Sequence, residues 1–181
     1  GGDDDLRRPF FAYVAFRECP SPSGPSGMKL RPSCPLRYYS AADVAVVQGG
    51  SLDALRRALR EWRPHLFWFA GHGDVGLSDE QRTLGFSGSD GTLQLFDPLT
   101  LASELRAHIP LQGGSLECVV LNACCSGGAL GTLGDLLVRC GVPSVVSWGS
   151  RAHNDASALF ARGFAAAAVG GEGYTEAYEA G

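Results

Sequence analysis

Two short, largely apolar runs, at 66–70 and 116–121, constrain the fold of this 181-residue chain more than any other feature. Both are too short and too evenly apolar for a surface helix, and both have the length of a strand that is covered on each face. Strand-length runs of the same kind lie at 10–16, 43–47 and 143–148. The pattern therefore predicts a buried, mostly parallel β-sheet in which 66–70 is a central strand.

Amphipathic, helix-like segments alternate with these strands. Ser51 can cap the first helix, Asp53 places an acid in its positively charged first turn, and Pro64 ends it. The other segments show the same spacing of apolar residues at steps of three and four. The helices are expected at about 51–63, 97–107 and 133–140, and from about residue 154 onward.

A β-hairpin interrupts this alternation. Segments 83–87 and 92–96 alternate between apolar and polar residues around a glycine-containing turn at 88–91. The other elements predict an α/β fold, a three-layer sandwich in which helices flank a mostly parallel central sheet, with right-handed crossovers and the hairpin as an insertion. We expect this single domain to span 10–181, after a flexible start at 1–9.

Charge and hydropathy exclude several classes of partner. The formal net charge is −4, and the arginines are spread mainly along one helical face. Nucleic acids and anionic membranes are bound by concentrated basic surfaces, so neither is expected as a partner. No apolar run reaches the roughly 18 residues that span a bilayer, and the acidic start does not resemble a leader. A cytoplasmic domain is expected, as one part of a longer polypeptide.

The six cysteines stand at irregular spacings and form no C-x-x-C pair. This pattern fits neither a disulfide framework nor a zinc site, so no metal and no cofactor is expected. Cys118 and Cys140 lie in apolar, periodic segments and are predicted to be buried thiols. Cys124 and Cys125 differ from them, because they directly follow the strand predicted at 116–121.

A histidine and a cysteine occupy matching places after the two apolar runs. His72 follows the first run and Cys124 follows the second. Because the carboxyl ends of parallel strands meet at one edge of a sheet, the two side chains share a crevice if their strands are neighbours. A thiolate can attack a carbonyl carbon while an imidazole protonates the leaving amine. The amides of Gly73 and Cys124 could stabilise the oxyanion. The alternative interpretations are a histidine in a plain turn and a packed thiol.

Five motifs follow one another along the chain: Ala70-Gly71-His72-Gly73, the hairpin with Leu93 and Leu95, Leu121-Asn122-Ala123-Cys124-x-Ser126-Gly127, Gly141-x-Pro143-Ser144-Val145-Val146, and Asp155 at a helix start. In this order they resemble the CHAT domain, a caspase- and separase-related group of clan CD cysteine peptidases. The resemblance covers about residues 10–181 and implies a caspase-like α/β sandwich. It also implies a catalytic dyad of His72 and Cys124, with Gly73 at the glycine of the family's oxyanion hole.

Two parts of this assignment leave alternatives open. Cys125 is the alternative nucleophile, since related metacaspases use the second cysteine of a pair, but the spacing A-C-x-S-G favours Cys124. Asp74 or Asp155 could place a carboxylate in the substrate pocket and select a basic residue before the scissile bond. For Asp155 the simpler interpretation is a helix start, where acidic residues are favoured. The remaining histidines are predicted to be surface or turn residues: His65, His108 and His153.

The expected function is a cysteine endopeptidase domain that cleaves protein or peptide substrates through a thioester acyl-enzyme, under the control of other domains of a longer chain. Two alternatives remain. The same fold can serve as a catalytically silent interaction or scaffold module within a larger signalling protein, since fold does not fix function. The same dyad could also belong to another thiol enzyme, such as an amidase or an acyltransferase.

Overall fold

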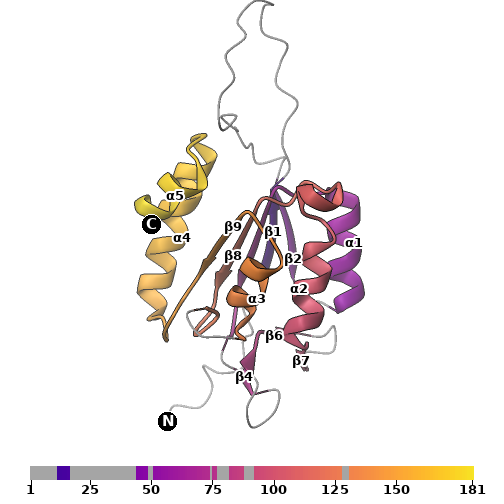
Figure 1. The fold of residues 1–181 in the computed structure, drawn as a ribbon. Coiled ribbons are helices and arrows are strands. Elements are labelled where there is room, and N and C mark those ends of the chain that lie inside the picture. Colours follow the sequence, from indigo (N-terminus) through magenta and orange to yellow (C-terminus); the bar gives the residue numbers. More distant parts are fainter. Residues whose placement is uncertain are drawn as a thin grey trace, which may run out of the picture.

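The computed structural model describes residues 12–16, 44–48, 51–73, 75–76, 82–87, 92–127 and 131–181. The predicted flexible start at 1–9, the hairpin turn at 88–91 and Asp74 lie outside the described residues. Within the described ranges, a five-stranded sheet has helices α1, α2 and α3 on one face and α4 and α5 on the other (Figure 1). This arrangement confirms the predicted α/β sandwich.

The sheet is mostly parallel. Its strand order is β2-β1-β3-β8-β9, with β3, β8 and β9 paired in parallel. β1 is antiparallel to both of its neighbours, so β2 runs in the same direction as β3. The strands are β1 (Ala12–Phe16), β2 (Val44–Gln48), β3 (Leu66–Ala70), β8 (Cys118–Asn122) and β9 (Ser144–Ser147).

The helices begin where the capping signals place them. The Ser51 hydroxyl accepts a hydrogen bond from the Ala54 amide at 3.2 Å, and the Asp97 carboxylate accepts one from the Thr100 amide at 2.8 Å. The segment predicted from residue 154 onward forms two helices that are separated by a turn at 170–173. The bounds are α1 (Leu52–Trp62), α2 (Pro98–Arg106), the 3-10 helix η3 (Pro110–Gln112), α3 (Leu133–Arg139), α4 (Asn154–Val169) and α5 (Tyr174–Ala180).

Short strands form the predicted insertion between β3 and α2. β6 (Gly85–Ser87) and β7 (Leu93–Leu95) pair as an antiparallel hairpin, which confirms the prediction. The predicted strand at 83–87 is interrupted at Leu84, whose side chain is buried in the core. The residues before this break form β5 (Arg82–Thr83), which pairs with β4 (Val75–Gly76).

The central strands bury side chains on both faces of the sheet, as predicted for parallel strands. From β3, Phe67 and Phe69 pack toward α1, α2 and α3, while Leu66 and Trp68 pack toward α4 and α5. The ring centroids of Trp68 and of Phe164 in α4 lie 5.3 Å apart, in an edge-to-face arrangement. Packing in both cores holds β3 in position within the sheet, and so it also positions the loop at 71–73 that follows β3.

The structure separates the two cysteines that were predicted to be buried. Cys118 is fully buried in the layer between the sheet and α4, which confirms the prediction, and burial raises the pKa of its thiol. Cys140 is only half-buried, at the end of α3. No helix in the described part of the chain is long and apolar enough to cross a membrane.

Candidate functional site

The register between β3 and β8 sets the geometry of the candidate site. Ala70 at the end of β3 pairs with Asn122 at the end of β8 in parallel register. Beyond these strand ends, the Gly71 amide donates a hydrogen bond to the Asn122 carbonyl oxygen at 3.4 Å. His72 and Cys124 each stand two residues past this pair, so the two loops leave the same edge of the sheet at the same level.

The two loops are in direct contact at Gly73. A Cβ atom at this position would overlap the carbonyl oxygen of Cys124, and it would lie 3.0 Å from both the Ala123 Cβ and the Cys124 nitrogen. Only a glycine allows this approach of one backbone to the other. The contact places the residue that follows His72 against the backbone of Cys124. Neither the Gly73 amide nor the Cys124 amide has a hydrogen-bond acceptor within the described ranges.

A buried serine holds the turn that carries Cys124. Ser126 is 4% exposed. It donates a hydrogen bond to the Leu121 carbonyl oxygen at 2.9 Å and accepts one from the Trp148 amide at 3.2 Å. The turn is therefore tied both to its own strand and to the end of β9. The sequence showed Ser126 only as part of a motif spacing, and its burial comes from the parallel packing of β8 against β9.

Cys125 takes the strained position of this turn. Its φ angle of 51° lies in the left-handed region that non-glycine residues seldom adopt. Its amide donates a hydrogen bond to the Ser150 carbonyl oxygen at 3.0 Å. Both cysteines of the pair are half-buried. The structure thus gives Cys125 a defined backbone role in this turn.

The chain that leads from β9 into α4 forms a second side of the site. The Cys124 thiol donates a hydrogen bond to the Ala152 carbonyl oxygen, with 3.7 Å between Sγ and O. His153 is the N-cap of α4, and its Nδ1 accepts a hydrogen bond from the Asp155 amide at 3.3 Å. Cys124 therefore lies close to the start of α4. The His72 side chain, on the other loop, is exposed.

The structure places the remaining candidate residues less centrally. Asp155 stands in the first turn of α4 with 88% of its side chain exposed, as expected for an acid at a helix start. His153, predicted to be a surface or turn residue, is exposed and caps this helix. Asp74 is not among the described residues. Within the described ranges, no three His, Cys, Asp or Glu side chains gather in a way that could hold a metal ion.

Asn122 is a residue of the site that sequence reasoning did not single out. Its side-chain oxygen accepts a hydrogen bond from the Trp148 indole at 2.7 Å, and its side-chain nitrogen donates one to the Ser157 carbonyl oxygen at 3.2 Å. One side chain therefore joins the ends of β8 and β9 to the first turns of α4. Its place in the cysteine motif was visible, but its partners are 26 and 35 residues away along the chain.

Comparison with known proteins identifies the family of this chain. No curated protein and no solved structure matches the chain. The family model of the CHAT domain matches residues 36–180, which is more than half of the chain and includes both loops of the candidate site. The chain therefore belongs to the CHAT domain family and has the caspase-like fold of clan CD.

Proposed function

We propose that this domain is a cysteine endopeptidase in which Cys124 is the nucleophile and His72 is the general acid and base. One observation carries the proposal: the parallel register of β3 and β8 brings the His72 loop and the Cys124 turn together at one sheet edge, with Gly73 packed on the Cys124 backbone. Open α/β sheets place their sites at this edge. Family membership is consistent with the same chemistry.

The proposed reaction is acyl transfer through a thioester. The Cys124 thiolate attacks the carbonyl carbon of the scissile peptide bond and forms a C–S bond. His72, which holds the thiol proton, passes it to the amine as the C–N bond breaks. A water molecule then attacks the thioester carbonyl carbon and forms a C–O bond, while His72 accepts the water proton. The C–S bond breaks, the carboxylic acid product leaves, and His72 returns the proton to the Cys124 sulfur. The free amides of Gly73 and Cys124 are the proposed donors to the oxyanion in both steps.

Among the cysteines of the described chain, Cys124 suits the nucleophile best. Cys118 is buried, and its raised pKa keeps the thiol protonated. Cys125 is tied to Ser150 in a left-handed conformation that serves the turn. The Cys124 thiol lies near the amino end of α4, and such helix ends stabilise a negative charge. Cys125 remains the alternative nucleophile.

The proposed substrate is a protein or peptide with a basic residue before the scissile bond. Asp155 stands at the start of α4, three residues after the carbonyl that the Cys124 thiol contacts, and Asp74 directly follows Gly73. A carboxylate at either place would pair with a lysine or arginine of the substrate. We also propose a cytoplasmic location, whose reducing conditions keep thiols free, and control by other domains of a longer chain.

One observation favours a second candidate, a catalytically silent interaction module. Two hollows in the described part of the chain are lined by β9, α4 and α5, and neither is lined by His72 or Cys124. A domain that only binds partners needs a groove and not a reactive thiol. The two candidates therefore differ in whether Cys124 reacts.

An electrophilic peptide probe separates these candidates. The probe carries a lysine next to an acyloxymethyl ketone, and the adduct is mapped by mass spectrometry in the wild type and in Cys124→Ala, Cys125→Ala and His72→Ala. We expect labelling and peptide hydrolysis to disappear in Cys124→Ala and His72→Ala and to persist in Cys125→Ala. Labelling that persists in Cys124→Ala would refute the nucleophile. An absence of labelling and of hydrolysis in the full-length protein would favour the interaction module.

A further inference from the structure

β9 ends the five-stranded sheet and leaves an open edge. β8 pairs with one side of β9, and no other strand in the described chain pairs with its outer side. The side chains of β9 are all half-buried. An edge of this kind presents backbone donors and acceptors to any strand that can approach it.

The register identifies the backbone groups that face outward. The Ser144 amide donates to the Glu117 carbonyl oxygen at 2.9 Å, so Ser144 faces β8. The Trp148 amide donates to Ser126 and its carbonyl accepts from Gly127, so Trp148 also faces inward. Backbone groups alternate along a strand. Val145 and Ser147 therefore direct their N–H and C=O groups away from β8, and neither residue has a hydrogen bond on that side within the described ranges.

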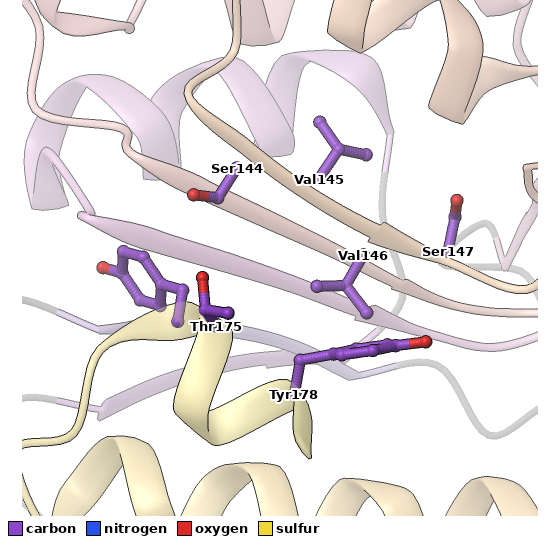
Figure 2. A pocket seen from close by; sticks show the side chains of 7 residues that line it. Ser144, Val145, Val146, Ser147, Thr175 and Tyr178 are labelled. Carbon is purple, nitrogen blue, oxygen red and sulfur yellow. The ribbon is translucent and has the colours of Figure 1, made fainter.

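A groove runs along this edge, between β9 and α5. It consists of two hollows of about 390 and 530 Å³ that share Val146, Ser147 and Tyr178. Figure 2 shows the Tyr178 ring extending from α5 past Val146 toward Ser147. The larger hollow is also lined by Trp148 and Leu159. Because Leu159 and Tyr178 are 59% and 57% exposed, the groove offers apolar surface that nothing in the described chain covers.

The groove also carries one negative charge. Glu179 of α5 lines the larger hollow, and it has no ion-pair partner in the part of the chain that the structure describes. Among the residues that the structure describes, no arginine, lysine or histidine lines either hollow. A ligand that reaches this end of the groove therefore meets an apolar wall and an unneutralised carboxylate, which together select an apolar side chain next to a basic one.

We propose that β9 and α5 form a docking site for an extended peptide segment of a partner protein, which adds to the sheet as a further strand. The outward groups of Val145 and Ser147 pair with the peptide backbone, as in other cases of strand addition. An apolar side chain of the peptide enters the hollow beside Trp148 and Leu159, and a lysine or arginine pairs with Glu179. This site is separate from the proposed catalytic pair and does not depend on its activity.

A peptide fits this edge better than a second copy of the chain. Two copies paired through β9 would be related by a two-fold axis, so each would bring its own α5 to the shared edge. α5 carries Glu176 and Glu179 and no basic residue. The two acidic helices would then repel each other, whereas a basic peptide is attracted. Self-association is thus an outcome that the test must exclude.

Amide hydrogen exchange of the full-length protein tests whether the edge is open. We expect the amides of Val145 and Ser147 to exchange on the order of a hundredfold faster than that of Val146, which faces β8. Equal protection of all three amides at every protein concentration would show that another segment of the polypeptide covers the edge. Protection that grows with protein concentration would show a second copy. Either result would overturn the proposal.

The ligand is tested with a β-hairpin peptide whose one free edge has the sequence Thr-Val-Thr-Val-Lys. Binding is measured by calorimetry on the Cys124→Ala protein, so that heat from peptide hydrolysis does not contribute to the signal. A preformed strand avoids the cost of ordering a flexible peptide. We expect binding to weaken about tenfold in Val145→Pro, which removes one outward N–H and keeps the ladder to β8. We expect a similar loss when the free-edge amides of the hairpin are N-methylated.

Charge reversal supplies the matched control. Glu179→Lys should weaken binding of the lysine hairpin and strengthen binding of a hairpin that carries glutamate at the same place. This reversal of charge preference between the two hairpins does not depend on whether Val145→Pro folds. The folding of Val145→Pro is checked separately by thermal unfolding. Absence of hairpin binding, or binding that neither Val145→Pro nor Glu179→Lys changes, would overturn the proposal.

Discussion

Substituting Gly73 by alanine tests whether the two loops of the site touch. The new Cβ would overlap the Cys124 carbonyl oxygen, and it would stand 3.0 Å from both the Cys124 nitrogen and the Ala123 Cβ, where ordinary contacts begin at 3.4 Å. The loops must therefore separate by several tenths of an ångström at two contacts and by more at the third. Forcing an extra carbon into a packed contact costs about 1–3 kcal/mol of folding free energy.

The same displacement has a larger effect on chemistry. A shift of about 1 Å between reacting groups costs on the order of a hundredfold in rate, which corresponds to roughly 2.7 kcal/mol. We expect Gly73→Ala to lose about 1–3 kcal/mol in urea unfolding and on the order of a hundredfold in the rate of peptide hydrolysis. Hydrolysis is measured without urea, at a temperature at which the variant is still folded.

Gly163→Ala is a matched control for this experiment. A Cβ on Gly163 of α4 would overlap the Ala180 carbonyl oxygen of α5, so it introduces a comparable clash between α4 and α5 and not between the two loops. The control should lose stability and retain its rate of hydrolysis. If Gly73→Ala were as stable and as active as the wild type, the contact between the loops would be disproved. If it lost stability but kept its rate, the contact would be structural only.

Three further predictions concern single side chains. Ser126→Ala should cost about 1–3 kcal/mol in urea unfolding, because the partly buried Trp148 amide loses its acceptor; an unchanged midpoint would contradict the bridge. Cys118 should resist iodoacetamide in the folded protein and react only after unfolding, because its thiol is buried with a raised pKa; rapid alkylation of the native protein would refute its burial. The hydrogen bond from Arg56 lowers the pKa of Glu104 below its ordinary value of 4.5, so its stabilisation is present above pH 4.5 and is lost as the pH falls through the folded-state pKa. The stability difference between the wild type and Glu104→Gln should therefore shrink below pH 4.5, and a constant difference down to pH 3 would contradict this.

The sequence predicts most of the fold because its signals are local. The apolar run at 66–70 needs cover on both faces wherever it lies, and Ser51 and Asp97 cap helices through bonds to amides three residues away. The turn that divides the last helical segment into α4 and α5 was not predicted. Gly170, Gly171 and Gly173 are a local signal for this turn, whereas the close packing of α5 on α4 at Gly163 is a tertiary contact that local pattern does not reveal.

The candidate site is predictable only in part, because its geometry depends on which strands are neighbours. The matching places of His72 and Cys124 after two apolar runs could be seen in the sequence, but the register that aligns Ala70 with Asn122 could not. The bridge made by Ser126 could not be foreseen for the same reason, since its partner Trp148, which directly follows β9, is 22 residues away. The geometry of the site therefore depends on the pairing of strands that are far apart in the sequence, which local sequence patterns do not specify.

The rate at which Cys124 reacts with a small alkylating agent tests the pairing of His72 with Cys124 most directly. The measurement follows iodoacetamide adducts at pH 7 by mass spectrometry, residue by residue, in the wild type and in His72→Ala, with Cys125 and Cys140 as internal references. A His–Cys pair predicts that Cys124 reacts fastest in the wild type and that His72→Ala slows it at least about tenfold while both references stay unchanged. Equal rates for Cys124 in the two proteins, or a fastest reaction at Cys125, would contradict the pair.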